Sequence, residues 1–285
     1  MENKEYIKNS DLETLFKNRI IQYDNFNSNS ELFIKNNKVY KIYFNNVDYT
    51  NFNINVIKNI FKNYCYLDKI SELVLPKKWI IYNDKIVGFN MPYISGITLE
   101  EIIKNNLDNK YNIKEIFINL LNIINKFDEL PFDFFLGDLH EKNIIIDNNG
   151  NTKIIDPDSY IINNEKLLVN GICLMGKYVN HFYNNDELMT IKKTADYYSL
   201  LCIILNYVFR DIIDDKLSPV TYLKKDSQFK GLYPLLDRVD DKFILLEEDI
   251  NNIFNFKSDL NYLPKDNMDL EKEIMRIRRI LKKES

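Results

Sequence analysis

Three oxygen-bearing side chains, Asp138, Asn143 and Asp156, are spaced so that they could hold a metal ion and a phosphate group. They flank two short apolar runs, 144–146 and 154–155, which are separated by an Asn-Asn-Gly sequence. An Asn-Gly pair between apolar runs is a strong signal for a β-hairpin. Antiparallel pairing brings the start of the first strand beside the end of the second, so we expect Asn143 to meet Asp156, with Asp138 on the preceding loop. Two oxygen ligands beside a third carboxylate predict a Mg²⁺-phosphate site.

The chain around this segment predicts the elements that must position it. Strands are expected in the sequences RIIQY, ELFIK, KVYKIYF, KKWIIY and IVGFNMPY, with a helix inserted over 53–68. After residue 98 the spacing of apolar residues becomes helical. Helices are expected at 113–127, 194–209 and 268–283, and a long loop over 161–190. The simplest division is a small β-rich part followed by a larger helical part.

The composition excludes several classes of protein. The chain has 285 residues, of which 45% are hydrophobic, so it can bury a sizeable core. Its net charge is −4, without the basic clusters of a nucleic-acid-binding surface, and no apolar run is long enough for a membrane span. The N-terminus is polar and acidic, unlike a signal peptide, and the cysteines are scattered. We expect a cytoplasmic protein that binds neither nucleic acid nor membrane, and the oligomeric state stays open.

Four segments, taken in order along the chain, resemble the protein-kinase-like superfamily. Val-Tyr-Lys-Ile at 39–42 resembles the strand that carries the phosphate-binding lysine, and 91–101 resembles the hinge and the helix after it. Asp138-Leu-His-Glu-Lys-Asn143 resembles the catalytic loop, and the interval from there to Asp156 matches the family's usual spacing. The segment that begins Thr-Ala-Asp196 resembles the central helix, whose Asp braces the catalytic loop in protein kinases.

The resemblance covers roughly residues 20–210 and implies an α+β, two-lobed kinase fold. After a lead-in over 1–19, residues 20–94 would form the N-lobe, a small five-stranded antiparallel sheet with one helix. Residues 95–285 would form the larger, helical C-lobe.

The resemblance also implies a role for each site residue. Asn143 and Asp156 would hold Mg²⁺ against the phosphates of ATP, and Lys41 would contact the α- and β-phosphates. Asp138 would orient the acceptor hydroxyl and take its proton.

The adenine would lie between the third strand and the hinge. Because side chains alternate along a strand, Val39 shares a face with Lys41 and would contact the ring. Backbone groups of Met91, Tyr93 and Ile94 would bind its edge.

The chain departs from the family where the phosphates should be held. The expected phosphate-covering loop, 25–30, contains no glycine. The helix that should offer a Glu to Lys41 has none, because no Glu occurs between Glu31 and Glu72. Asp68 and Glu72 are the nearest substitutes, and both come late for the centre of that helix.

The family's catalytic triplets also read differently. His-Arg-Asp is replaced by Leu-Gly-Asp138, Asp-Phe-Gly by Asp156-Pro157-Asp158, and no Ala-Pro-Glu follows. Gly-Asp-Leu-His is instead similar to aminoglycoside and choline kinases.

Three functions remain open. The leading hypothesis is an ATP- and Mg²⁺-dependent Ser/Thr protein kinase with a protein substrate, because the central helix and the interval to Asp156 both match protein kinases. The first alternative is a small-molecule kinase. The second is a pseudokinase that binds a partner and transfers nothing. Retention of Asp138, Asn143 and Asp156 favours activity, whereas loss of the glycines and the helix Glu favours a scaffold.

Overall fold

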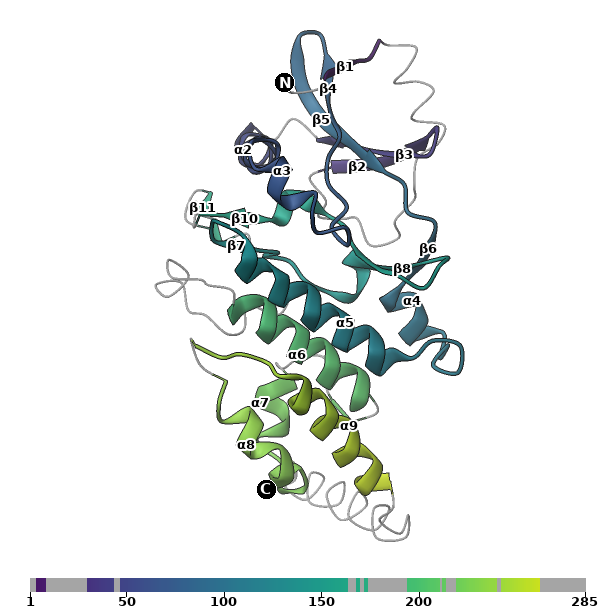
Figure 1. Ribbon diagram of the computed structural model, residues 1–285, viewed down its shortest axis with the longest axis vertical. Helices are drawn as coiled ribbons and strands as arrows, with labels where there is room; N and C mark the ends of the chain where they lie inside the picture. Colours follow the sequence, from purple (N-terminus) through teal and green to yellow (C-terminus); the bar gives the residue numbers. More distant parts are fainter. Residues whose placement is uncertain are drawn as a thin grey trace, which may run out of the picture.

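The computed structural model describes the polypeptide over residues 4–8, 30–43, 47–163, 168–169, 172–173, 194–210, 212–213, 219–239 and 242–261. The protein is mixed α/β. A five-stranded sheet lies at one end, and the helices α5, α6 and α9 are stacked below it in that order (Figure 1). Within the described ranges, no helix combines the length and apolar character needed to cross a membrane.

The main sheet is mixed, whereas an antiparallel sheet was expected. Its strand order is β1-β4-β5-β3-β2, and β1 pairs parallel with β4 while the other neighbours are antiparallel. The strands are β1 (Lys4–Tyr6), β2 (Ser30–Lys35), β3 (Lys38–Tyr43), β4 (Lys78–Tyr82) and β5 (Lys85–Pro92). Strand β1 lies in the segment expected to be a lead-in, and the strand expected at RIIQY lies outside the described residues.

Strand β1 is held by side chains as well as by its backbone. Glu5 accepts hydrogen bonds from Tyr40 Oη at 2.8 Å and from Asn90 Nδ2 at 2.7 Å. Both donors lie on strands beyond β4, the neighbour of β1 in the sheet, on β3 and β5. A three-residue strand carries no readable period, so this edge depends on tertiary contacts that a local pattern does not show.

Two tight turns set the register of the sheet. Asn36 and Asn37 have φ of 53° and 60°, and Asn83 and Asp84 have φ of 47° and 59°. Paired left-handed residues are typical of two-residue hairpin turns, which match the twist of the flanking strands. The resulting register places Lys41 in the middle of β3, opposite Leu32 on one side and Phe89 on the other.

The helix expected at 53–68 is present as two helices. The first is α2 (Val47–Lys62), and the second is the single turn α3 (Tyr64–Leu67), which starts after Asn63. Thr98 and Glu101 form a capping box that starts α4 (Leu99–Lys104). The two long helices expected at 113–127 and 194–209 are confirmed as α5 (Ile113–Lys126) and α6 (Thr194–Val208). The helix expected at 268–283 lies outside the described residues.

Helix α6 is at the centre of the core. Every residue from Thr194 through Leu205 is buried, including the polar residues of the first turns. A helix that is apolar on all sides is typical of the interior of a larger protein. It packs between α5 and α9 (Glu247–Asn261), with the short helices α7 (Pro219–Leu223) and α8 (Tyr233–Leu236) nearby (Figure 1).

The predicted hairpin is confirmed as β8 (Ile144–Asp147) and β9 (Thr152–Ile154), and β6 (Gly96–Thr98) adds a third strand. The turn uses Gly150 at φ 84°, where a side chain would be strained.

Short strands follow in the region expected to be a loop. Strand β10 (Ile161–Ile162) pairs with β7 (Phe134–Phe135), and β11 (Leu168–Val169) pairs with β12 (Ile172–Cys173).

Candidate active site

The hairpin brings Asn143 next to the residue that precedes Asp156. The N–H of Ile155 donates to the carbonyl of Asn143 at 2.9 Å, directly beyond the Ile144–Ile154 pair of the ladder. The side chain of Asn143 donates to the carbonyl of Asp138 at 3.0 Å. The three residues singled out by their spacing therefore lie on adjoining stretches of backbone.

The loop that carries Asp138 is held from below by α6. Asp196, which is only 1% exposed in the first turn of this helix, accepts the N–H of Leu136 at 2.8 Å. The next residue, Gly137, has φ of 74°, and a Cβ there would lie 2.4 Å from the carbonyl oxygen of Ser159. The loop is thus fixed by a buried carboxylate and by a position that only glycine fits.

Asp138 faces a histidine. The Nε2 of His140 lies 3.5 Å from Asp138 Oδ2, and His140 Nδ1 accepts the N–H of Lys142 at 3.2 Å. Burial alone would lower the pKa of His140, but the hydrogen bond and charge of Asp138 outweigh it and the pKa is raised. Because Nδ1 is an acceptor, the ring directs its Nε2 proton at Asp138.

The lysine of β3 reaches across to the end of the hairpin. Lys41 Nζ donates to Asp156 Oδ1 and, at 2.6 Å, to Asp158 Oδ1. Tyr43, two residues further along the same strand, donates to Asp158 Oδ2 at 3.0 Å. We call Lys41, Tyr43, Asp156 and Asp158 the charge cluster. Tyr43 and Asp158 were not predicted as site residues.

Burial and charge act in opposite directions in the charge cluster. Burial would lower the pKa of Lys41, but the carboxylates of Asp156 and Asp158 outweigh it, so the pKa is raised and the amine stays charged. Burial would raise the pKa of Asp156, but Lys41 lowers it. Burial raises the pKa of Asp158, Lys41 lowers it, and the charge of Asp156 raises it again. The net result is a pKa of about 6. With both carboxylates ionised, the cluster holds one positive and two negative charges, which favours an added cation.

Asp156 has a backbone conformation that few non-glycine residues adopt. Its φ is 71° and its ψ is 59°, in the left-handed region, and Pro157 follows as the first residue of a 3₁₀ turn. The hydroxyl of Ser159 donates to the carbonyls of Leu136 and Asp156, each at 2.9 Å. These bonds tie the residue after the hairpin to the loop before it, and such maintained strain is typical of functional sites.

The two carboxylates considered as partners for Lys41 are engaged elsewhere. Asp68 lies 3.4 Å from Lys77, and Glu72 lies 2.6 Å from Lys126. The acid that meets the lysine comes instead from the Asp-Pro-Asp sequence after the hairpin.

The residues predicted to bind adenine lie at the start of β3 and at and just beyond the end of β5, close to Lys41 in the ladder. Val39 is buried and is paired with Met91 across the β3–β5 ladder. The N–H of Tyr93 donates to the carbonyl of Asn37 at 3.1 Å, so Tyr93 offers its carbonyl and exposed side chain rather than this donor. Ile94 is half-buried and packs against the core.

The oxygen atoms near the hairpin suit Mg²⁺. Within the described part of the chain, no three or more His, Cys, Asp or Glu side chains gather as a metal site. Mg²⁺ needs fewer protein ligands, because it is usually bound by one or two carboxylates together with substrate phosphates. The amide N–H of Asn143 donates to the carbonyl of Asp138, which leaves its Oδ1 as the atom that would bind a metal, and the side chain of Asp156 is 29% exposed. This donor set fits Mg²⁺ held together with a phosphate.

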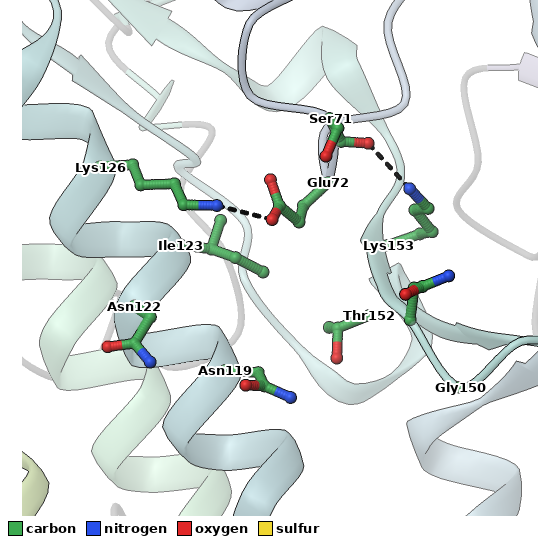
Figure 2. Close-up of a pocket in the computed structure, with 10 residues that line it drawn as sticks. Ser71, Glu72, Asn119, Asn122, Ile123, Lys126, Gly150, Thr152 and Lys153 are labelled. Atoms are coloured by element: carbon green, nitrogen blue, oxygen red, sulfur yellow. Dashed lines mark hydrogen bonds and ion pairs between the residues drawn. The ribbon is translucent and has the colours of Figure 1, made fainter.

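A separate cavity of about 430 Å³ lies on the other side of the hairpin, between α5 and β9. Figure 2 shows Asn119, Asn122 and Thr152 around it, with the Glu72–Lys126 ion pair at its rim. None of the predicted site residues lines it, so it is distinct from the charge cluster.

Comparison with known proteins identifies no family for this chain. No protein-family model matches the chain, and no curated protein matches it. The function must therefore be argued from the residues themselves.

Proposed function

We propose that this chain is an ATP- and Mg²⁺-dependent phosphotransferase of the protein-kinase-like superfamily, acting on Ser or Thr hydroxyls of a protein. The observation that carries the proposal is the pairing of Lys41 with Asp156 across a sequence separation of 115 residues. Phosphoryl transfer depends on positioned charges more than on covalent chemistry, and a strand lysine beside a metal-binding carboxylate supplies them.

Each residue of the proposed site would have a role in binding the nucleotide. Asn143 Oδ1 and the Asp156 carboxylate would hold Mg²⁺, which neutralises charge on the phosphates when it is bound. Lys41 would turn its ammonium group from Asp156 to the α- and β-phosphates. Val39 would lie against the adenine, with Met91 next to it on the neighbouring strand.

The transfer step begins at Asp138. Its carboxylate would accept the proton of the substrate hydroxyl while the hydroxyl oxygen forms a bond to the γ-phosphorus. The bond from the γ-phosphorus to the bridging oxygen breaks, and ADP leaves with that electron pair. His140 would hold the Asp138 carboxylate in position through Nε2. The brace from Asp196 to Leu136 would keep this loop fixed during the reaction.

The proposal extends to the architecture and the compartment. Residues 20–94 would be the smaller lobe and 95–285 the larger one, with the nucleotide between them. The free, exposed thiol of Cys65 supports a reducing compartment, and we propose the cytoplasm.

One observation favours a second candidate, a small-molecule kinase. His140 contacts Asp138 directly, in the Gly-Asp-Leu-His loop that is similar to aminoglycoside and choline kinases. That candidate shares the nucleotide site and differs only in the acceptor.

Incubation with γ-labelled ATP and Mg²⁺ tests the proposal. Wild-type protein is expected to label itself or added protein, and Asp138→Asn and Asp156→Asn to lose about a hundredfold or more of the rate. Asp237→Asn is the matched control, because Asp237 is exposed in a surface pair with Lys224. Label found only on small metabolites would favour the second candidate. Absence of any transfer, with every metal tried, would leave a partner-binding pseudokinase.

A further inference from the structure

We propose that Asp158 is the positioning residue that keeps Lys41 aimed at the nucleotide while Asp156 binds the metal. The inference rests on the proposed function and adds a division of labour between the two carboxylates. It replaces the helix Glu that the kinase fold uses for this purpose with an acid from the segment after the hairpin.

Asp158 lies beside the helix from which the kinase resemblance expects the partner of Lys41. Helix α2 packs against the 3₁₀ turn Pro157–Ser159, which carries Asp158. The kinase resemblance calls for a glutamate from this helix to meet Lys41, but α2 contains no Glu. The two later acids, Asp68 and Glu72, are paired with other lysines. Asp158 therefore occupies the region in which the missing carboxylate is needed.

Asp156 cannot bind a metal ion and keep its full interaction with Lys41. In the structure its Oδ1 accepts from Lys41, and its side chain is 29% exposed, so a cation can approach it. Once Asp156 binds Mg²⁺ and phosphate, its hold on Lys41 weakens. A buried ammonium needs a paired charge, so a second carboxylate must remain with it.

Both carboxylate oxygens of Asp158 are bound by side chains of the protein. It is 7% exposed, its Oδ1 accepts from Lys41 at 2.6 Å, and its Oδ2 accepts from Tyr43 at 3.0 Å. Pro157 fixes the backbone before it, and Ser159 ties the backbone after it to Leu136. Asp158 is thus held by Lys41, Tyr43 and its flanking backbone, in addition to its neighbour Asp156.

The expected consequence concerns nucleotide binding first. Without the Asp158 charge, Lys41 is left with Asp156 alone and competes there with Mg²⁺. We expect Asp158→Asn to weaken Mg²⁺–ATP binding about 10- to 100-fold, the usual cost of removing a group that orients a ligand. Asp158→Glu, which keeps the charge, should recover part of the loss.

A double-mutant cycle on the dissociation constant of a fluorescent ATP analogue with Mg²⁺ tests the proposal. The variants are Asp158→Asn, Lys41→Met and the double variant, with Glu72→Gln as the control carboxylate outside the site. If Asp158 acts through Lys41, Asp158→Asn weakens binding in the wild-type background and adds little in the Lys41→Met background. Wild-type affinity in Asp158→Asn, or a full additional loss in the double variant, overturns the proposal.

Folding and function are separated by two further measurements. Thermal unfolding reports whether Asp158→Asn is folded. If it is not, Tyr43→Phe removes the bond to Asp158 Oδ2 while keeping the ring contact with Phe89. Its binding should then weaken in the same direction, and unchanged binding counts against the proposal. If the wild-type protein itself binds no Mg²⁺–ATP, the proposed function fails first, and the role of Asp158 fails with it.

Discussion

Lys41 keeps its charge in a site where it is only 9% exposed because two carboxylates face it. Neither carboxylate is redundant, since Asp156 also faces solvent and Asp158 is bound on both oxygens. At the scale of single residues, we expect the pairing of these charges to govern both the stability of the fold and the proposed nucleotide binding.

Removal of the lysine should therefore destabilise the fold. Lys41→Met leaves the buried carboxylate of Asp158 without its cation, and breaking one side of a buried pair costs about 3 kcal/mol. Urea unfolding should show this loss, and Asp158→Asn placed on the same background should restore part of it. A change below about 0.5 kcal/mol, the range of ordinary surface substitutions, would contradict the pairing.

His140 should affect transfer and leave nucleotide binding alone. His140→Ala removes the ring whose Nε2 faces Asp138, so the carboxylate loses its orientation. Steady-state kinetics should show kcat lowered about tenfold with KM for ATP unchanged, since loss of an orienting partner typically costs 10- to 100-fold. Equal changes in kcat and KM would place His140 elsewhere in the mechanism.

Two of the four members of the charge cluster could be predicted as site residues from the sequence. Lys41 and Asp156 were predicted from their neighbours in the sequence. Asp158 and Tyr43 were not, because neither matches a site position of the kinase-like pattern, and their bond depends on how β3 lies over the hairpin. No local pattern contains that information.

At the scale of elements, α6 and the hairpin hold the site from two sides. The hairpin places Asn143 beside Ile155, and the first turn of α6 places Asp196 under Leu136. Both elements were predictable, because an Asn-Gly turn and a long apolar period are strong local signals.

The brace from α6 can be tested by one substitution. Asp196→Ala leaves the buried N–H of Leu136 without this acceptor, which should cost about 1–3 kcal/mol. The loop carrying Asp138 should loosen as well, so transfer should fall further than the stability loss explains. Chemical unfolding combined with the labelling assay checks both effects. Wild-type transfer in a folded Asp196→Ala protein would remove the brace from the account.

Strand β1 could not be predicted from the local sequence pattern. Its three residues have no period, and its parallel pairing with β4 depends on Glu5 meeting Tyr40 and Asn90. The expected antiparallel sheet was wrong at this edge for that reason.

At the scale of the whole molecule, the charge cluster links the main sheet to the hairpin and, through Leu136 and Asp196, to the helical core. Nucleotide binding at this junction should stabilise the entire fold, because a ligand that binds only the folded state adds to its stability. The hairpin and the long helices α5 and α6 were predictable from local patterns, whereas β1, the short strands after residue 160 and most contacts between distant elements were not.

The proposed Mg²⁺–ATP site is tested most directly by the affinity for ATP, measured by calorimetry with Mg²⁺ and again with EDTA. If Lys41, Asn143 and Asp156 form a Mg²⁺–ATP site, wild-type protein should bind ATP with Mg²⁺ and lose at least about tenfold in affinity with EDTA. Asp156→Asn should bind weakly and show little response to the metal. Equal affinity with and without Mg²⁺ in the wild-type protein, or no binding at all, would contradict the account.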